Sequence, residues 1–399
     1  MPSPDVVVIG AGISWTSFAF HAARAGQRVL VVERETRAGG CLHTERTDTG
    51  FWYELGAHTC YNSYQTFLEL IEGCGLAGEL EVRGKPVLRF LAGNELVPGQ
   101  NLGLLWRQLD KCELLRALPR WRGAQKEGQS VRAYYSRLIG AGNYERVLAA
   151  LLAAVPSQPA DDFPAEMLFK QRARRRDVPR SFTLKGGLQR VVEGVLRQPR
   201  IETRLGRTAR AIERAGAGFR VHLDDGERCA ARILALAVPP SEAAMLLAAI
   251  APRAAACAAE VKETAIESLG FALPSAAVSL PYATFLVPRG DCFHSCVTRD
   301  VVPDARWRAF TFHFRPETGR AQRLQRAAEV LHLRSHEFLA VTERRGVLPA
   351  PTLGHERRVR ALDQELAGLS LAVTGNWFGG LAIEDCVQRS RAEWQRVSA

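Results

Sequence analysis

The chain has 399 residues and is 47% hydrophobic, which is long enough for two hydrophobic cores, so we expect two interleaved domains. Its 53 lysines and arginines exceed its 42 acidic residues and give a formal net charge of +11, which favours anionic partners. Without a helix-turn-helix, zinc-finger or aromatic RNA-binding signature, no nucleic-acid partner is expected. The nine cysteines lack framework spacing and the apolar runs are too short or broken to span a bilayer, so we expect a cytoplasmic protein, with peripheral membrane contact left open.

The first predicted unit is a strand, a helix and a second strand. An apolar run over residues 5–9 predicts a buried strand, which Gly10 to Gly12 interrupt before a helical stretch that ends near Ala25. A second buried strand covers residues 28–32 and ends at Glu33. The spacing matches that of a parallel crossover unit.

This unit has the chemistry of a dinucleotide site. The free N–H groups and dipole at a helix N-terminus attract a pyrophosphate, and a Gly-Ala-Gly turn lets the phosphates approach the backbone. A carboxylate at Glu33 can accept hydrogen bonds from ribose hydroxyls, which argues against NADP. The expected cofactor contacts here are Gly10, Gly12, Ile13, Ser14, Glu33 and Arg34.

Trp15 departs from the dinucleotide pattern, because a third glycine normally stands there and lets the helix pack closely on the strand. Two interpretations compete. Either the helix tilts to house the indole, or the mononucleotide pocket is remodelled or even vacant. We favour the first, because the first strand and Glu33 keep the expected register.

The rest of the chain suggests an insertion, a meander and a second group of strands. Residues 76–180 have a mostly helical and polar pattern and are interpreted as an inserted cap. Turn signals then predict a β-meander over residues 201–204, 208–214, 219–223 and 232–237. Further strands are expected within residues 265–315 and a helix within 320–340.

A second glycine cluster carries a family resemblance. Arg37-Ala38-Gly39-Gly40 follows Glu33, and Glu54-Leu55-Gly56-Ala57-His58 comes next. This order resembles the FAD enzymes of the amine oxidase, protoporphyrinogen oxidase and phytoene desaturase group. The resemblance implies that Gly39, Gly40, Gly56 and Ala57 lie along the cofactor. Many members have an arginine directly after the glycine pair, and this chain has Cys41, which removes one anion contact.

The resemblance extends to the C-terminus. Residues 181–189 resemble the family's Gly-Gly-Leu-Gln turn, and Ala209 stands where members run a strand past the adenine. Residues 285–288 and 354–355 are closer to protoporphyrinogen oxidases than to other branches. Residues 375–386 resemble the C-terminal flavin segment, where a new helix directs its N–H groups at a reduced flavin ring. This implies cofactor contacts from Gly375, Asn376, Gly380, Ala382 and Ile383.

Other candidate groups are weaker. Cys292, His294 and Cys296 alternate, but no second ligand pair accompanies them, so we predict no metal site. The basic run over residues 170–176 is interpreted as a solvated face, with an anionic substrate or lipid headgroups as the alternative. His58 and Tyr61 either pack beside the cofactor or line the substrate side of the flavin.

We therefore predict an α/β flavoprotein with a Rossmann-type, glutathione-reductase-like FAD domain interleaved with a mixed sheet-and-helix substrate domain. The expected boundaries are residues 1–75, 181–238 and 345–399 for the FAD domain and 76–180 and 239–344 for the substrate domain. The predicted activity is hydride transfer to FAD from a C–H or C–N centre of an anionic or apolar small molecule, with molecular oxygen or another acceptor reoxidising the flavin. No catalytic base is assigned, because Lys262, the lysine in the plausible region, lacks a supporting motif.

Three alternatives stay open at this point. The first is an amine oxidase or a desaturase; a porphyrinogen-like substrate is favoured over an amine because no lysine motif is found. The second is a non-oxidative flavoprotein similar to UDP-galactopyranose mutase, which shares the early glycines and a Gly-Ala-His turn. The third is a degenerate protein that has lost FAD, suggested by Trp15 and Cys41.

Overall fold

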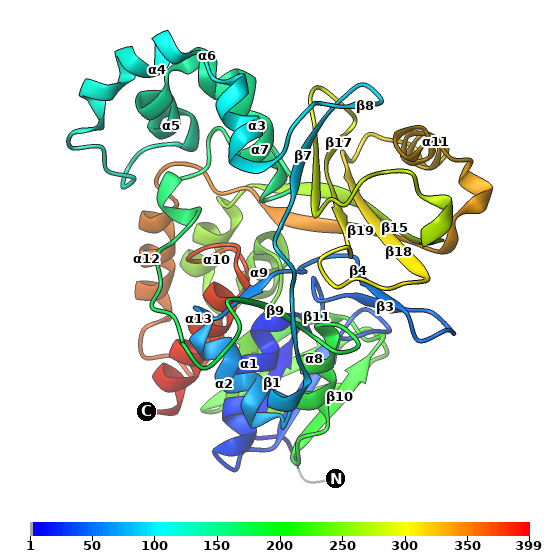
Figure 1. The fold of residues 1–399 in the computed structure, drawn as a ribbon. Helices are drawn as coiled ribbons and strands as arrows, with labels where there is room; N and C mark the ends of the chain where they lie inside the picture. The colour runs from blue at the N-terminus through cyan, green and yellow to red at the C-terminus, as the bar shows by residue number, and fades with distance from the viewer. Residues whose placement is uncertain (1–2) are drawn as a thin grey trace.

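The protein has a mixed α/β fold in a computed structural model that describes residues 3–399, so the first two residues of the expected FAD domain lie outside it. A five-stranded parallel sheet forms its lower half (Figure 1). In spatial order its strands are β10 (Ile201–Leu205), β2 (Val29–Glu33), β1 (Val6–Ile9), β14 (Ile233–Leu236) and β20 (Leu371–Val373).

Helices cover both faces of this sheet, which explains why its strands are continuous apolar runs. Val6 and Val8 of β1 face one core, and Val7 and Ile9 face another, as the two-residue period of a strand requires. The first core is closed by α1 (Ile13–Arg24), α2 (Gln65–Gly73), α8 (Gln189–Leu196) and α13 (Ile383–Ser398). The second is closed by α9 (Pro240–Leu247), α10 (Pro252–Ala259) and α12 (His355–Leu366).

The predicted four-stranded meander is wrong in its outer members. The observed meander has three antiparallel strands, β11 (Ala209–Ala215), β12 (Gly218–Leu223) and β13 (Arg228–Ala231). The runs predicted as its first and last strands are β10 and β14, and both pair in parallel within the five-stranded sheet. Turn signals in the sequence show where a strand ends, but they do not show which distant strand it pairs with.

A seven-stranded sheet forms the second half of the molecule. Its order is β19 (Leu339–Pro349), β15 (Glu263–Pro274), β18 (Trp307–Phe314), β17 (Phe293–Thr298), β16 (Phe285–Pro288), β7 (Leu88–Ala92) and β8 (Glu95–Leu96). Helix α11 (Arg320–Leu331) packs on one face through a phenylalanine-rich core. Strand β19 was not predicted, and it runs across the domain boundary expected at residue 345.

The expected helical insertion begins later than its sequence pattern suggested. Residues 80–96 form strands, including β6 (Leu80–Val82), and the helices begin at Asn101. They form a lobe that projects from the upper left of Figure 1. Its helices are α3 (Asn101–Gln108), α4 (Lys111–Ala117), α5 (Val131–Ile139), α6 (Ala141–Asn143) and α7 (Ala149–Ala154).

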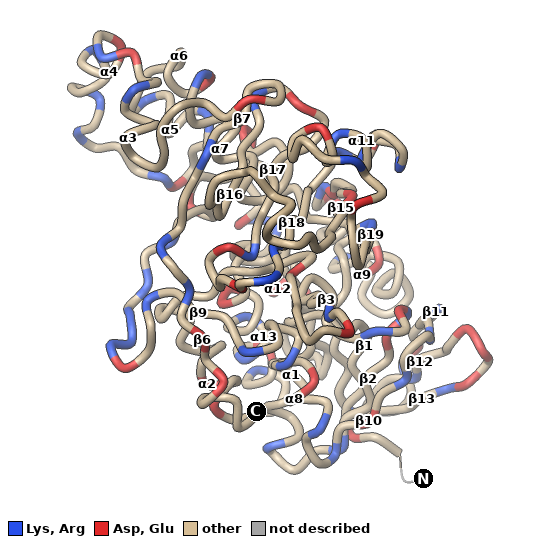
Figure 2. Tube along the Cα trace, turned by 45° about the vertical axis from the view of Figure 1, so that its right-hand side comes forward, with Lys and Arg blue, Asp and Glu red and all other residues tan. Residues whose placement is uncertain are grey.

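Two small sheets join the halves. Strand β3 (Thr44–Arg46) pairs with β4 (Trp52–Glu54), and β9 (Ser181–Leu184) lies between β5 (Cys60–Tyr61) and β6. Across residues 3–399, no helix is long and apolar enough to cross a membrane. Basic and acidic residues are interspersed along the whole trace rather than gathered on one face (Figure 2).

Candidate functional site

The site is built at the carboxyl edge of the parallel sheet, where β1 ends and α1 begins. Gly10 has a φ of +94°, and a Cβ there would lie 2.4 Å from the carbonyl oxygen of Ala237, so only glycine fits. Gly12 is the N-cap of α1, and a Cβ on it would meet nothing within 4 Å. No side chain caps the helix, so the N–H groups of its first turn, including those of Ile13 and Ser14, have no side-chain acceptor.

Glu33 stands at the end of β2 and is held by backbone groups. Its Oε2 accepts a 2.5 Å hydrogen bond from the Ala11 N–H, and its Oε1 accepts one of 2.8 Å from the Glu35 N–H. Each carboxylate oxygen keeps a further lone pair for another donor. Arg34 is exposed, and its Nη1 donates to the Glu242 carboxylate at 3.0 Å; its contact with the cofactor stays a prediction.

The glycine pair Gly39–Gly40 lies directly against the α1 turn. The Gly39 N–H donates to the Ala11 carbonyl at 2.6 Å, and Gly39 forms a bridge with Gly12. A Cβ on Gly40 would lie 2.8 Å from the Gly12 Cα. The structure therefore brings together the two glycine clusters that the sequence singled out, and their close approach explains why neither carries a side chain.

The C-terminal segment reaches the same edge. Helix α13 lies parallel to α1: Ser17 donates to the Val387 carbonyl at 3.2 Å, and the Phe18 and Trp394 rings are 5.5 Å apart. Both helices therefore begin near the carboxyl ends of β1 and β20, and their positive dipole ends point the same way. The predicted residues Gly375, Asn376, Gly380, Ala382 and Ile383 form this connection from β20 to α13.

The first turn of α13 is fixed by Asp385. Its Oδ2 accepts a hydrogen bond of 3.2 Å from the Ala382 N–H, and a Cβ on Gly380 would lie 2.3 Å from the same oxygen. Glu384, the preceding residue, is fully buried and accepts from the Thr66 and Phe67 N–H groups at 3.0 Å each, so it caps α2. The sequence predicted the segment that contains both residues, but it assigned no role to either carboxylate.

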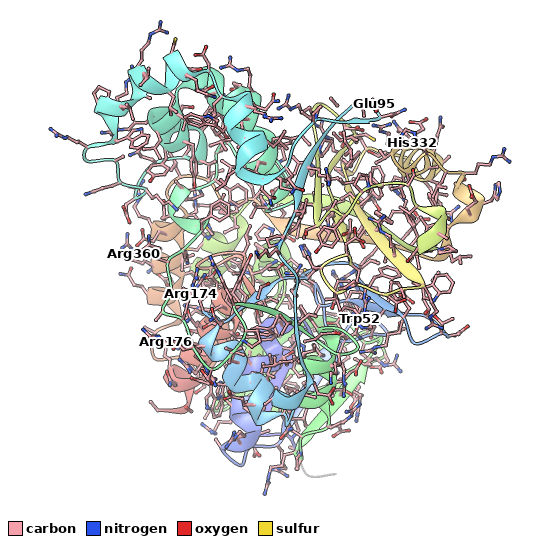
Figure 3. The ribbon with its side chains drawn as sticks, in the orientation of Figure 1. Trp52, Glu95, Arg174, Arg176, His332 and Arg360 are labelled. Atoms are coloured by element: carbon pink, nitrogen blue, oxygen red, sulfur yellow. The ribbon has the colours of Figure 1, made fainter. Side chains whose placement is uncertain are left out.

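The basic run over residues 170–176 is neither a free solvated face nor an open anion site along its whole length. Arg172 and Lys170 approach the same Asp385 oxygen at 2.6 and 3.1 Å, and Arg175 pairs with Glu72 at 2.6 Å. Arg174 and Arg176 are exposed (Figure 3). The run ties its loop to the starts of α13 and α2, so its charges serve mainly to hold the segment in place.

Two other arginines converge on the glycine pair. Arg37 Nη2 donates to the Gly40 carbonyl at 3.1 Å, and Arg344 Nη1, from β19, donates to the same oxygen. Burial, together with the neighbouring Arg344 charge, lowers the pKa of Arg37 to about 10. Arg344 thus brings a guanidinium beside Cys41 from some 300 residues further along the chain, which local motifs could not reveal.

The loop Gly56–His58 is fastened to the glycine pair's loop. The Ala57 N–H donates to the Cys41 carbonyl at 2.9 Å, and a Cβ on Gly56 would lie 2.2 Å from that oxygen. His58 Nδ1 donates to the Gly56 carbonyl at 2.9 Å, and its ring packs 5.6 Å from the Phe285 ring. Ala209 is buried at the start of β11, where it pairs with Leu223.

Next to this loop, residues of β4 and of the seven-stranded sheet line a partly open cavity of about 30 Å³. Trp52, labelled in Figure 3, is one of its lining residues. That volume holds roughly two water molecules. Its lining residues come from five separate segments: Trp52, Tyr53, Glu54, His58, Arg83, Thr183, Val297, Thr298, Arg299, Val301, Val302, Ala309 and Thr311. The cavity includes the predicted His58 but not Tyr61, which is 44% exposed on β5.

The titratable groups of the cavity are strongly affected by burial. Burial raises the pKa of the Glu54 carboxyl to about 7, although the Leu188 N–H at 2.7 Å and the Thr44 hydroxyl at 2.8 Å oppose this. Burial and the charge of Arg83 lower the pKa of His58 to about 4. At neutral pH the His58 ring is therefore uncharged, and because Nδ1 donates to a carbonyl, Nε2 is left as an acceptor.

A second histidine faces the same side of the sheet. His313 on β18 lies 3.0 Å from the Ser268 hydroxyl on β15, and both are buried. Burial, with His58 and His294 nearby, lowers the pKa of His313 to about 3. No group of three or more potential metal ligands is found within residues 3–399.

Trp15 is housed in the core between the sheet and its helices. The side chain is fully buried in the same cluster as Val8 and Val31. Its indole N–H finds no hydrogen-bond partner among the described residues. The structure agrees with the interpretation that the indole is accommodated within the fold, and the space beside Gly12 stays open.

Comparison with known proteins identifies relatives along most of the chain. The family described as "Flavin containing amine oxidoreductase" matches residues 17–94 and 95–284. All-trans-retinol 13,14-reductase from Danio rerio is 44% identical over 54 residues, which is 14% of this chain and 9% of that protein. The matched segment is therefore a small fraction of the curated relative's length.

Two solved structures share the fold over nearly the whole chain. One, provisionally assigned as a protoporphyrinogen oxidase from Exiguobacterium sp. 255-15, has a TM-score of 0.77 at 19% identity and covers 99% of this chain and 98% of its own. The other is a reduced UDP-galactopyranose mutase, with a TM-score of 0.73 at 16% identity, covering 99% and 95%. At such identities the likeness concerns the fold alone.

Proposed function

The chain belongs to the flavin-containing amine oxidoreductases, and from that membership we propose that it binds FAD along the carboxyl edge of its parallel sheet and oxidises a C–H or C–N centre of a small molecule. One observation carries the proposal. The uncapped start of α1, the carboxylate of Glu33 and the start of α13 lie at a single sheet edge. These are the groups that a pyrophosphate, a ribose and a reduced flavin ring respectively require.

Each part of the cofactor has a proposed partner. The N–H groups after Gly12 would bind the pyrophosphate, and the free lone pairs of Glu33 would accept from the ribose hydroxyls. Arg344 would supply an anion contact that Cys41 cannot, because its guanidinium already lies at the Gly40 carbonyl. When bound, a flavin supplies hydride acceptance, and the protein's role is to position the substrate and tune the charges around it.

The substrate side is proposed to lie at the cavity beside the Gly56–His58 loop. His58 presents a neutral ring whose Nε2 can accept a hydrogen bond or a proton from a substrate N–H group. No lysine lines this cavity, and the buried arginines favour an acidic substrate such as a porphyrinogen over an amine. Molecular oxygen or another acceptor would complete the cycle.

Purification and spectroscopy test the proposal. Yellow protein whose heat-released cofactor elutes as FAD supports the cofactor assignment, and faster anaerobic bleaching by protoporphyrinogen than by a panel of amines supports the substrate preference. Colourless protein that fails to bind added FAD contradicts the proposal and favours a protein that has lost its cofactor. A flavin that is bleached only by amines would contradict the substrate preference alone.

Peripheral membrane contact is proposed for the helical lobe. Its outer surface exposes Leu102 (80%), Trp106 (57%) and Trp121 (48%) beside the exposed Arg116 and Arg120. Tryptophans and arginines together suit the interface of an anionic bilayer. Co-sedimentation with vesicles containing phosphatidylserine, but not with purely zwitterionic ones, is expected, and replacing both tryptophans by serine should abolish it.

A further inference from the structure

Three hydrogen-bond donors among the residues that line the small cavity have no partner in the protein, and two of them are fully buried. Arg83 is only 8% exposed, yet its guanidinium makes no hydrogen bond or ion pair with another residue within residues 3–399. The Nε of Arg299 and the hydroxyl of Thr183 are also buried and unpaired. Buried polar groups are almost always paired, so three orphans on one cavity indicate a missing acceptor.

The missing acceptor must carry negative charge. Arg299 donates to the Val302 carbonyl at 2.8 Å and stacks within 4.4 Å of the Trp52 ring, but neither contact neutralises it. Glu54 is the one carboxylate among the lining residues, and its two oxygens accept from the Leu188 N–H and the Thr44 hydroxyl. Glu54 acts electrostatically on both arginines, and Glu81 and Asp304 act on Arg299, but none of these carboxylates forms an ion pair with either guanidinium. A water molecule would satisfy the donors without supplying an ion pair.

Neighbouring arginines show what this chain does elsewhere. Arg308, close by on β18, forms a two-pronged pair with the buried Asp300, and Arg323 pairs with Glu343. Arg83 differs from these two arginines because it is mostly buried and makes no ion pair with a described residue, although the Glu54 carboxyl is close enough to act on it. Its position is fixed by the backbone, since its N–H donates to the Ser181 carbonyl at 3.1 Å beside Thr183 on β9.

We propose that Arg83, Arg299 and Thr183 form an internal anion site that binds a carboxylate group of the substrate. A planar guanidinium binds a carboxylate through two parallel hydrogen bonds, and the cavity volume of about 30 Å³ suits such a head group. The site lies beside His58, so a substrate anchored there extends toward the Gly56–His58 loop. Only the identification of the carboxylate as part of a substrate rests on the proposed function.

Calorimetric titration of the purified protein with benzoate in chloride-free buffer tests the site, with benzamide as the neutral counterpart. Wild type should bind benzoate about tenfold or more tightly than benzamide, the scale of one charge-assisted hydrogen bond. Arg83→Met should remove this discrimination while leaving benzamide unchanged. Arg83→Lys should keep part of it, and the exposed Arg176→Met should behave as wild type.

Thermal melts guard against a folding artefact. Because it removes a buried unpaired charge, Arg83→Met should melt above wild type in anion-free buffer, and benzoate should raise the melting temperature of wild type only. If Arg83→Met does not fold, Thr183→Val should still weaken benzoate binding several-fold through the loss of one donor. An unchanged benzoate affinity in Thr183→Val would then overturn the site.

Several results of these experiments would contradict either the anion site itself or its assignment to a substrate carboxylate. Equal affinities for benzoate and benzamide, or equal behaviour of Arg83→Met and Arg176→Met, would overturn the inference. Displacement of benzoate as readily by chloride as by formate would assign the site to any small anion and overturn its assignment to a substrate carboxylate. Visible absorbance of the same samples reports flavin: colourless protein that discriminates benzoate would sink the proposed function but leave the anion site standing.

Discussion

The cofactor edge and the proposed substrate cavity lie side by side, but the polar groups of the edge are hydrogen-bonded within the protein and several of those in the cavity are not. At the edge, the fold itself supplies partners: Glu33 accepts from two backbone N–H groups, and the Gly39 N–H donates to Ala11. In the cavity, the Thr183 hydroxyl and the Nε of Arg299 are buried without partners among the described residues, and the mostly buried Arg83 makes no ion pair with them. The contrast shows that the edge is preorganised by its own backbone, whereas the cavity is completed by what binds there.

The largest effect is expected at Gly10, where the edge depends on a missing side chain. Gly10→Ala would place a Cβ 2.4 Å from the Ala237 carbonyl at a φ of +94°. Strain and overpacking together should cost roughly 2 to 5 kcal/mol of unfolding free energy, measured by urea denaturation. A loss below about 0.5 kcal/mol would show that the backbone relaxes and that the edge is not rigid.

Gly12→Ala is the matched control, because a Cβ there meets nothing within 4 Å. The variant should unfold at the same urea concentration as wild type. If that open space is the pyrophosphate's, flavin affinity should nevertheless fall about tenfold or more, since the new methyl holds the phosphates off the helix N-terminus. Unchanged affinity would mean that the cofactor lies elsewhere.

In the cavity, Glu54 should make stability depend on pH. Its folded pKa of about 7 is raised above the unfolded value of 4.5, so its stabilising contribution is fully present below pH 4.5 and is lost as the pH rises through 7. The shift corresponds to at most about 3 kcal/mol. Unfolding free energies at pH 5 and pH 8 should therefore diverge more in wild type than in Glu54→Gln. Equal pH slopes would show that this carboxyl is ionised in the folded protein.

Glu33→Ala tests the cofactor edge, where the carboxylate is hydrogen-bonded to the backbone. Loss of its hydrogen bonds to the ribose should weaken flavin binding by about 1 to 3 kcal/mol. The Ala11 and Glu35 N–H groups would also lose their acceptor, so a smaller loss of stability is expected. Equilibrium titration of the flavin-free protein with FAD measures the affinity. An affinity equal to that of wild type would remove Glu33 from the ribose site.

The edge could be predicted from sequence because its parts are local. Gly10, Gly12, Glu33, Gly39 and Gly40 fall within one strand-helix-strand unit and the turn after it, where backbone geometry dictates the residue type. The apolar strands likewise follow from burial on both sheet faces. What the sequence could not show is which sheet a strand joins, as β10 and β14 illustrate.

The cavity could not be predicted, because its residues are distant in sequence and ordinary in type. Arg83 follows β6, Thr183 lies on β9 and Arg299 follows β17, and each belongs to a chain with 53 basic residues where a single arginine is no signal. Arg344 at the glycine pair is a similar case, since β19 itself was missed. His58 was identified only because it lies within a local motif.

The smallest effect is expected at Trp15, whose indole N–H is buried without a partner in the core beneath the cofactor edge. Its indole is fully buried among apolar side chains and its N–H has no partner, which costs about 1 to 3 kcal/mol. Trp15→Phe removes that N–H but also loses packing volume, at a cost of similar size. We therefore expect the free energy of unfolding, measured by urea denaturation, to change by less than about 1 kcal/mol and the flavin affinity to stay the same. Trp15 differs from Arg83 in this respect. The indole carries no charge, so we interpret its unpaired N–H as a result of core packing and not as a ligand contact. A loss above about 3 kcal/mol in Trp15→Phe would mean that the N–H is hydrogen-bonded in solution, for example to an ordered water. A change in flavin affinity at unaltered stability would instead place the indole at the cofactor.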